Sequence, residues 1–184
     1  MARIRIISGE FGGRWISADV SRATHPMGDR VRSGLFNILE SRNVLKNAEI
    51  LDVFAGTGAV GFEALSRGAK SAIFIEQDKT AQKVIDDNIT TLKINEQAKL
   101  IKTSVANWLR TEKSAKFDLI FADPPYRNPQ FSTVFRLIDS LKPNGLMILS
   151  YVSRETAPKP NGVVVVDKRS YGEASLAIYR KVNR

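Results

Sequence analysis

Short runs of apolar and β-branched residues recur along the chain and predict a series of strands. These runs lie at 50–54, 72–75, 100–103, 119–122, 146–151, 163–166 and 176–179. Between several of them, apolar residues recur every three or four positions, which is the spacing of one helix face. Such stripes fall at 60–65, at 81–92 and at 134–141, the last one ending on Leu141. Strands that alternate with helices predict βαβ units and a mainly parallel sheet covered on both faces.

The two ends of the chain depart from this alternation. Residues 1–22 contain two apolar segments around Gly12-Gly13 and predict an N-terminal β-hairpin. Residues 28–40 follow with the periodicity of a helix. The last two predicted strands are joined by residues 168–174, too few for a crossover helix, so we expect them to pair antiparallel. The sequence therefore predicts one α/β domain over residues 1–184.

Composition removes several classes of chemistry. The chain has no cysteine and one histidine, which argues against disulfides, thiolate metal sites, a cysteine nucleophile and a multi-histidine metal centre. Its uncharged apolar runs are too short to span a bilayer, and its first residues lack the apolar core of a secretion signal. We therefore expect a cytoplasmic, monomeric protein without a metal or a membrane anchor. Both tryptophans, Trp15 and Trp108, are expected in or partly in the core, where aromatic residues are commonest.

The excess of positive charge lies at the two ends. The formal net charge is +9; residues 1–46 carry eight basic and four acidic side chains, and residues 159–184 carry six and two. The centre, residues 47–158, is nearly neutral, with 14 basic and 13 acidic side chains. A basic protein of this kind favours a polyanionic partner, with simple solubilisation as the alternative.

The first strand of the alternating region runs into a glycine-rich loop. Gly56, Gly58 and Gly61 fit the pattern G-x-G-x-x-G, and Glu76 closes the next strand 20 residues after Gly56, which suits a ligand with a ribose diol. Asp52 precedes the loop, and its carboxylate would repel a pyrophosphate but suits an ammonium or sulfonium group. These charges favour S-adenosylmethionine (AdoMet) over a dinucleotide, unless Asp52 only accepts hydrogen bonds from backbone amides.

A second motif follows the fourth run of the alternating region. Asp123, Pro124, Pro125 and Tyr126 come directly after the strand, where reaction sites lie in open α/β sheets. Asp123 and the Pro124 carbonyl can each accept one N–H of an exocyclic base amine, aim its lone pair and stabilise the positive charge that develops on it. Tyr126 can stack on the base. The alternative is a loop that the prolines merely stiffen.

Together, these motifs carry a family resemblance. The segments 52–58 and 123–126 resemble the Class I AdoMet-dependent methyltransferases that modify base amino groups. More narrowly, the segments 5–9, 13–14, 29–32, 35–37, 171–173 and 177–180 resemble the bacterial 16S rRNA guanine-N2 methyltransferases. The resemblance implies a Rossmann-like, seven-stranded sheet with an antiparallel last strand, and methylation of a guanine in small-subunit rRNA. Where this family usually has Arg-Pro-Thr, the chain has His25-Pro26-Met27, so that segment's contacts do not carry over.

The resemblance also implies roles for individual residues. AdoMet would contact Asp52, Gly56 and Gly58 around its methionine end, Glu76 at the ribose, and Gln77, Ser104 and Val105 around the adenine. Phe54 is also expected to contact the cofactor. The base would contact Asp123, Pro124, Pro125 and Tyr126. The partner would be 16S rRNA or the assembling 30S subunit. From the charge distribution, we expect the basic ends to form one surface around the mouth of the pocket, where RNA phosphates would be held by Arg3, Arg5, Arg14, Arg30 and Arg32.

Three other functions remain open on the sequence alone. An adenine-N6 or cytosine-N4 methyltransferase of DNA or RNA would use the same Asp-Pro-Pro-Tyr chemistry. An NAD-dependent oxidoreductase would use the glycine loop but would leave Asp52 and the Asp-Pro-Pro-Tyr turn unexplained. A non-catalytic RNA-binding module would use only the basic ends of the chain.

Overall fold

Seven strands form one sheet in the computed structural model, which describes residues 2–18 and 27–182. The strands are β3 (Glu49–Val53), β4 (Ser71–Glu76), β5 (Ala98–Lys102), β6 (Phe117–Ala122), β7 (Leu141–Val152), β8 (Val163–Tyr171) and β9 (Ala174–Lys181). Their order is β5-β4-β3-β6-β7-β9-β8. β3 to β7 run parallel, and β9 lies antiparallel between β7 and β8. The predicted sheet and its C-terminal hairpin are therefore confirmed.

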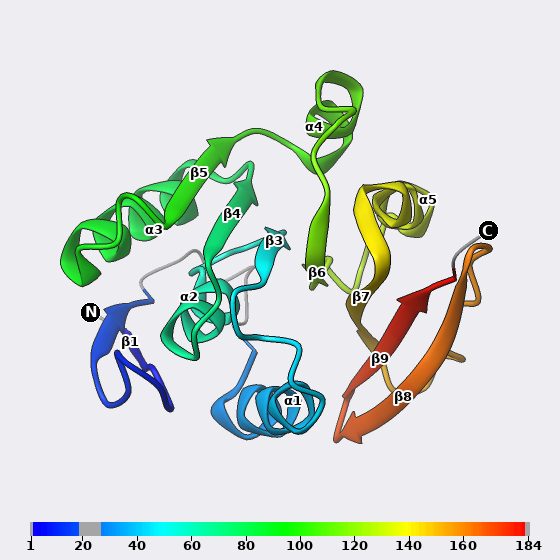
Figure 1. Cartoon of the computed structure of the whole chain (residues 1–184), viewed down its shortest axis with the longest axis horizontal. Coiled ribbons are helices and arrows are strands. Elements are labelled where there is room, and N and C mark those ends of the chain that lie inside the picture. Colours follow the sequence, from blue (N-terminus) through cyan, green and yellow to red (C-terminus); the bar gives the residue numbers. More distant parts are fainter. Residues whose placement is uncertain (1, 19–26, 183–184) are drawn as a thin grey trace.

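Helices cover both faces of this sheet (Figure 1). One face packs against α1 (Asp29–Ser41), α2 (Ala59–Ser66) and α3 (Lys79–Leu92), and the other against α4 (Val105–Thr111) and α5 (Phe131–Arg136) with the 3-10 turn η1 (Leu137–Ser140). Successive strand side chains point to opposite faces. Ile50 accordingly belongs to the core under α1 to α3, and Leu51 to the core under α4 and α5.

The helical stripe predicted at 134–141 is partly wrong. The helix gives way to η1, and Leu141 already belongs to β7, where it pairs with Phe117. A 3-10 helix has three residues per turn. Leu141 therefore keeps the apolar spacing set by Leu137 and Ile138, although it is not helical. The short helix α4 was not predicted, because its seven residues are too few for a convincing period.

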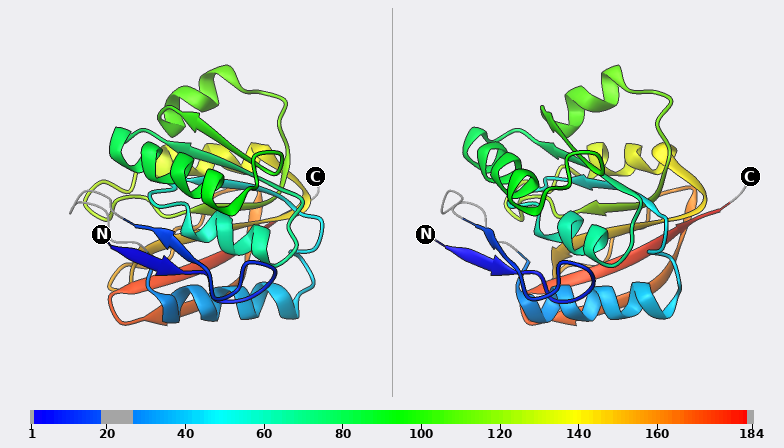
Figure 2. Two further views of the ribbon diagram at one scale, coloured as in Figure 1. Left: turned by 90° about the vertical axis from the view of Figure 1, so that its left-hand side faces the viewer. Right: turned by 60° about the vertical axis from the view of Figure 1, so that its left-hand side comes forward.

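The N-terminal hairpin lies outside the helix layer, beside α2 (Figure 2). Its strands β1 (Arg3–Arg5) and β2 (Trp15–Ser17) pair antiparallel, as predicted. Ile16 is buried against the main core, so the hairpin has an inner and an outer face. The prediction for Trp15 is wrong: it lies on the outer face with 56% of its surface exposed, whereas Trp108 is buried as expected.

Within residues 2–18 and 27–182, no helix is long and apolar enough to cross a membrane. In the same part of the chain, histidine and acidic side chains do not gather in groups of three that could hold a metal ion.

Candidate active site

The carboxyl ends of three central strands bring the two motifs together. Val53 of β3 pairs with Ile75 of β4 on one side and with Ala122 of β6 on the other. The residues that follow these strand positions therefore lie in neighbouring rows at the same sheet edge. The residue after Val53 begins the glycine loop, and the residue after Ile75 is Glu76. The residue after Ala122 is Asp123, which begins the Asp-Pro-Pro-Tyr turn.

The glycine loop needs glycine at two positions for different reasons. Gly58 has a φ of +76°, and a Cβ there would lie 2.5 Å from the Phe62 ring. Gly61 lies in α2, where a Cβ would lie 2.3 Å from the Phe74 ring of β4. The first glycine permits the left-handed turn, and the second lets α2 pack closely on the sheet.

Glu76 holds the glycine loop from the neighbouring strand. Its Oε2 accepts a hydrogen bond from the Gly56 N–H at 2.8 Å. Its Oε1 accepts from the Gln77 N–H at 2.7 Å and the Asp78 N–H at 2.8 Å. The side chain is 7% exposed, so these three donors compensate for most of the water that the carboxylate gives up on burial. Glu76 is therefore a structural anchor of the loop in addition to being a candidate ribose ligand.

Asp52 is buried in β3 behind the loop and accepts a hydrogen bond from the Gly61 N–H at 3.0 Å. This is the backbone contact that the sequence analysis held open as an alternative role. Burial raises the pKa of Asp52 well above its usual value, and the nearby charges of Asp123 and Glu76 raise it further, while the Gly61 bond opposes the rise. Three carboxyl groups thus lie at this edge, and burial disfavours the ionised forms of Asp52 and Asp123. A cationic ligand group would favour their ionisation, whereas a pyrophosphate would oppose it.

A pocket opens beside these groups. It is lined by Phe54, Ile75, Glu76, Gln77, Thr103, Ser104, Val105 and Gln130. Five of the residues predicted to contact the cofactor lie on it together; Asp52, Gly56 and Gly58 are not among its lining. Phe54 has a φ of +57°, a left-handed conformation that is strained for an aromatic residue and occurs mostly at functional sites.

Three residues of this pocket, Ile75, Thr103 and Gln130, were not predicted from the sequence. Ile75 and Thr103 lie at or just beyond strand ends that were predicted, so their position offered a signal. Gln130 offered none, because a left-handed backbone with a φ of +48° brings it to the pocket from the loop before α5.

In the Asp-Pro-Pro-Tyr turn, Asp123 is partly exposed, Pro124 is buried, and Pro125 and Tyr126 are exposed. Surrounding protein atoms desolvate the Asp123 carboxyl and raise its pKa, which a hydrogen bond from the Ser150 hydroxyl partly offsets. The Tyr126 hydroxyl lies 3.0 Å from the Ser150 Oγ. The turn therefore presents a carboxyl group and an aromatic ring at the sheet edge, and the tyrosine hydroxyl is held by a buried serine of β7.

Comparison with known proteins identifies the family. The family described as Conserved hypothetical protein 95 matches residues 4–180. The chain belongs to this family. Ribosomal RNA small subunit methyltransferase D of Haemophilus influenzae is 35% identical over 182 residues, which cover 96% of this chain and 93% of that protein. The family resemblance that the motifs carry is thereby confirmed.

Solved structures agree with the fold of this member of the family. The structure of yhhF from Escherichia coli is 30% identical and matches with a TM-score of 0.87, covering 100% of both chains. A more distant protein, SMU.776, is 15% identical with a TM-score of 0.63 and was solved in complex with SAH, S-adenosylhomocysteine. That match covers 77% of this chain and 48% of SMU.776.

Four of the five arginines predicted to hold RNA are exposed in this family member. Arg3 and Arg5 lie on the outer face of the hairpin, with Arg5 directly opposite Trp15 in the strand register. Arg14 is exposed beside them and donates a hydrogen bond to the Thr91 carbonyl at 2.8 Å. Arg30 is exposed on α1. His25 and Pro26 lie outside the described residues, and Met27 is partly buried.

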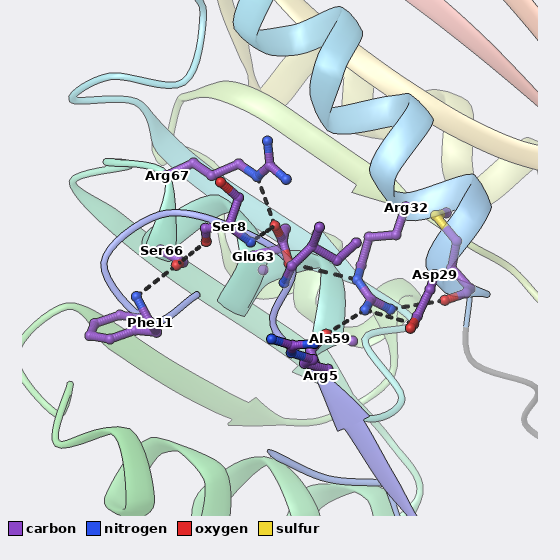
Figure 3. Close-up of polar contacts among 12 residues, drawn as sticks. Arg5, Ser8, Phe11, Asp29, Arg32, Ala59, Glu63, Ser66 and Arg67 are labelled. Carbon is purple, nitrogen blue, oxygen red and sulfur yellow. Dashed lines mark hydrogen bonds and ion pairs between the residues drawn. The ribbon is translucent and has the colours of Figure 1, made fainter. Parts of the chain in front are cut away.

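The prediction for Arg32 is wrong. Arg32 is 1% exposed and donates to the backbone carbonyls of Met27 at 3.1 Å and Arg5 at 2.7 Å, and to Asp29 Oδ1 at 2.9 Å. Figure 3 shows its guanidinium enclosed between the hairpin and α1, facing Glu63. A buried guanidinium already engaged in this way cannot meet a phosphate at the surface. Arg32 instead fastens the hairpin to α1.

Glu63 of α2 fastens the hairpin from the other side. Its fully buried carboxylate accepts the N–H groups of Ile7 at 2.8 Å and Ser8 at 3.1 Å and pairs with Arg67 Nε at 2.7 Å. A basic side chain reads as a surface residue in sequence, so this buried network was not foreseen. It gives the hairpin a fixed position relative to the glycine loop, which begins the same helix.

The expectation of one basic surface made by both ends of the chain also needs correction. Lys181 of β9 donates to the Leu141 carbonyl at 2.7 Å, at the start of β7. That is the opposite end of the sheet from Asp123, so this part of the C-terminal charge lies away from the candidate site.

Proposed function

We propose that this protein transfers a methyl group from AdoMet to the exocyclic N2 amine of a guanine in 16S rRNA of the small ribosomal subunit. The observation that carries the proposal is the junction of two motifs at one sheet edge. A pocket lined by Phe54, Glu76 and Ser104 adjoins the turn that carries Asp123 and Tyr126. The name of the Haemophilus influenzae relative supports rRNA of the small subunit as the substrate.

The residues present fit AdoMet. The positive charges of its ammonium and sulfonium groups would favour the ionised forms of the Asp52 and Asp123 carboxyls, which burial opposes. The pocket lining combines apolar side chains such as Val105 with polar ones such as Gln77. SAH bound to SMU.776, which shares the fold, supports the same ligand class. When bound, AdoMet supplies an electrophilic methyl group, and the chain's task is to hold the cofactor and aim the amine.

The Asp123 turn would aim and activate the target nitrogen. A guanine N2 amine is a weak nucleophile because its lone pair is delocalised into the ring. If the Asp123 carboxylate accepts one N–H and the Pro124 carbonyl the other, the lone pair is directed out of the base plane. The negative carboxylate also favours the positive charge that grows on nitrogen during transfer. The exposed Tyr126 ring, 42% of whose surface is accessible, is available to stack on the base.

The outer face of the hairpin would hold the RNA around that base. Arg3 and Arg5 supply charge for phosphates, and Trp15, opposite Arg5 in the strand register, supplies an exposed ring for stacking. The buried clamp through Glu63 and Arg32 keeps this face rigid, which lowers the entropy cost of binding. We propose that the protein acts as a monomer in the cytoplasm on 16S rRNA or on the assembling 30S subunit.

Calorimetry and a methyl-transfer assay test the proposal in two steps. Titration with AdoMet should show binding, and titration with NAD should not; the reverse would favour an oxidoreductase. Tritiated AdoMet should then label rRNA in the presence of the protein, and the Asp123→Ala variant should bind AdoMet without labelling RNA. AdoMet binding with no methyl transfer by the wild type to RNA or 30S particles would contradict the proposed activity.

A further inference from the structure

Gln130 comes to the candidate cofactor pocket from a different part of the fold than its neighbours there. Seven of the eight lining residues lie at or just after the carboxyl ends of β3, β4 and β5. Gln130 instead lies beyond β6, at the end of the segment 123–130, which begins with the Asp-Pro-Pro-Tyr turn. It therefore brings to the pocket a side chain from the same segment that carries the candidate base-holding groups.

Local contacts fix the backbone on both sides of Gln130. The Asn128 N–H donates to the Pro125 carbonyl at 3.0 Å and closes a tight turn, and Pro129 restricts the chain directly before Gln130. The Gln130 carbonyl accepts the first two helical N–H groups of α5, at 2.9 and 3.0 Å. Between these anchors Gln130 has a φ of +48° and a ψ of +39°, a left-handed conformation that is uncommon outside glycine. Such strained conformations cluster at active sites and ligand contacts.

The chemistry of the pocket lining suits a heteroaromatic ring with polar edges. Phe54, Ile75 and Val105 supply apolar surface, and Glu76 is the candidate ribose ligand. An adenine ring carries an amine that donates and ring nitrogens that accept. The Gln130 side-chain amide offers an acceptor oxygen beside a donor nitrogen. Glutamine recognises adenine in nucleic acids through this same pair of complementary bonds.

The other polar side chains of the pocket match an adenine edge less well. Glu76 can only accept when ionised, and it already accepts three backbone N–H groups. Thr103 and Ser104 each offer a single hydroxyl, and that of Ser104 already accepts a backbone N–H of α4 at 3.2 Å. Gln77 also carries an amide, but it is exposed, whereas Gln130 is partly buried. A hydrogen bond shielded from water is electrostatically stronger, which favours Gln130.

We propose that Gln130 recognises the adenine of AdoMet, with its side-chain amide accepting from the 6-amino group and donating to a ring nitrogen. The inference rests on the proposed function and adds to it a residue that selects an adenine nucleoside. Because the segment 123–130 joins Gln130 to Asp123, cofactor recognition and base positioning share one stiff stretch of backbone. A side chain fixed in this way pays little conformational entropy when the cofactor binds.

Calorimetry with SAH, and with an SAH analogue that has hydrogen in place of the 6-amino group, isolates this contact. In the wild type, loss of the amine should weaken binding about fivefold to a hundredfold, the range for a bidentate amide–adenine pair. Gln130→Met keeps the length of the side chain without its amide, and Gln130→Asn suits the left-handed backbone but carries a shorter amide. Both variants should bind SAH more weakly, and removal of the amine should then cost them no more than about twofold.

Asn128→Ala is the matched control from the same segment. Asn128 is exposed, and the turn uses its backbone N–H rather than its side chain. This variant should bind SAH and lose affinity for the amine-free analogue as the wild type does. If removal of the amine weakens binding equally in the wild type and in the Gln130 variants, or if Asn128→Ala behaves as they do, Gln130 does not recognise the adenine.

The same titrations separate this inference from the proposed function. Wild-type protein that does not bind SAH would overturn the role of Gln130 together with the proposed cofactor. Wild-type protein that binds SAH, depends on the amine through Gln130 and yet methylates no RNA would support the role of Gln130 and refute only the proposed activity.

Discussion

Replacing Glu76 by glutamine perturbs one atom of the site and has effects that the structure makes calculable. The amide oxygen can keep the two bonds from Gln77 and Asp78, but the amide nitrogen then faces the Gly56 N–H, which the carboxylate had accepted at 2.8 Å. In the variant, the amide nitrogen and the Gly56 N–H are two donors that face each other at the place of the charged acceptor. A hydrogen bond to a charged group is worth about 1.5–3 kcal/mol. In a domain of this size each kcal/mol shifts Tm by about 2–4 °C, so Glu76→Gln should lower Tm by about 3–12 °C.

The same substitution should weaken AdoMet binding by about tenfold to a hundredfold, because the glycine loop and the ribose both lose a charged acceptor. Calorimetry measures the affinity and differential scanning calorimetry the Tm. Glu49→Gln is the control, because Glu49 begins β3 at the opposite sheet edge. Lys142 and Lys70 lower the pKa of Glu49, and its side chain is about a third exposed (34%). Such surface pairs contribute about 0–1 kcal/mol. A Glu76→Gln protein that melts and binds AdoMet as wild type does would refute this account of the loop.

Further substitutions probe the turn, the hairpin face and the hairpin clamp. Asp123→Ala should cut methyl transfer by about 10²–10³ with AdoMet affinity retained, whereas Asp123→Asn should keep part of the rate through its amide oxygen. Because burial raises the pKa of Asp123, the wild-type rate should fall with acid at a pH above the value of about 3.9 typical of aspartate. Arg3→Ala with Arg5→Ala should flatten the slope of log affinity for RNA against log salt concentration by about 0.7 per lost contact. Arg42→Ala should leave that slope unchanged, because the Arg42 side chain pairs with Asp167. Glu63→Gln should destabilise the fold by about 3–5 kcal/mol and speed hydrogen exchange of the hairpin amides it accepts; unchanged exchange would contradict the clamp.

Much of the fold was predictable because burial imposes a pattern. The strands of a covered sheet need continuous apolar runs. The glycine loop and the Asp123 turn each come directly after one of these runs. Leu141 shows the limit of this logic. Its spacing fits a helix, a 3-10 turn and a strand start equally well, and only its pairing with Phe117 decides between them.

The site was less predictable where the residue type suggests the wrong degree of burial. Arg32 reads as a surface cation, yet carbonyls of Met27 and Arg5 together with Asp29 supply enough acceptors to bury it. Trp15 reads as core, yet it stands on the outer face of a two-stranded hairpin whose inner face is filled by Ile16. Ser150 carries no motif, and the register of β7 with β6 brings it to the turn, where it lies 3.0 Å from the Tyr126 hydroxyl. These positions depend on contacts between distant segments, which residue type alone does not encode.

The most direct test of the central claim is the identity of the methylated nucleoside. Purified protein and tritiated AdoMet would be incubated with 16S rRNA and with 30S particles from a strain that lacks the enzyme, and the RNA digested and separated into nucleosides. The account predicts that the label runs with N2-methylguanosine and is absent with Asp123→Ala. Label in N6-methyladenosine or N4-methylcytidine, or no label in either substrate, would contradict it.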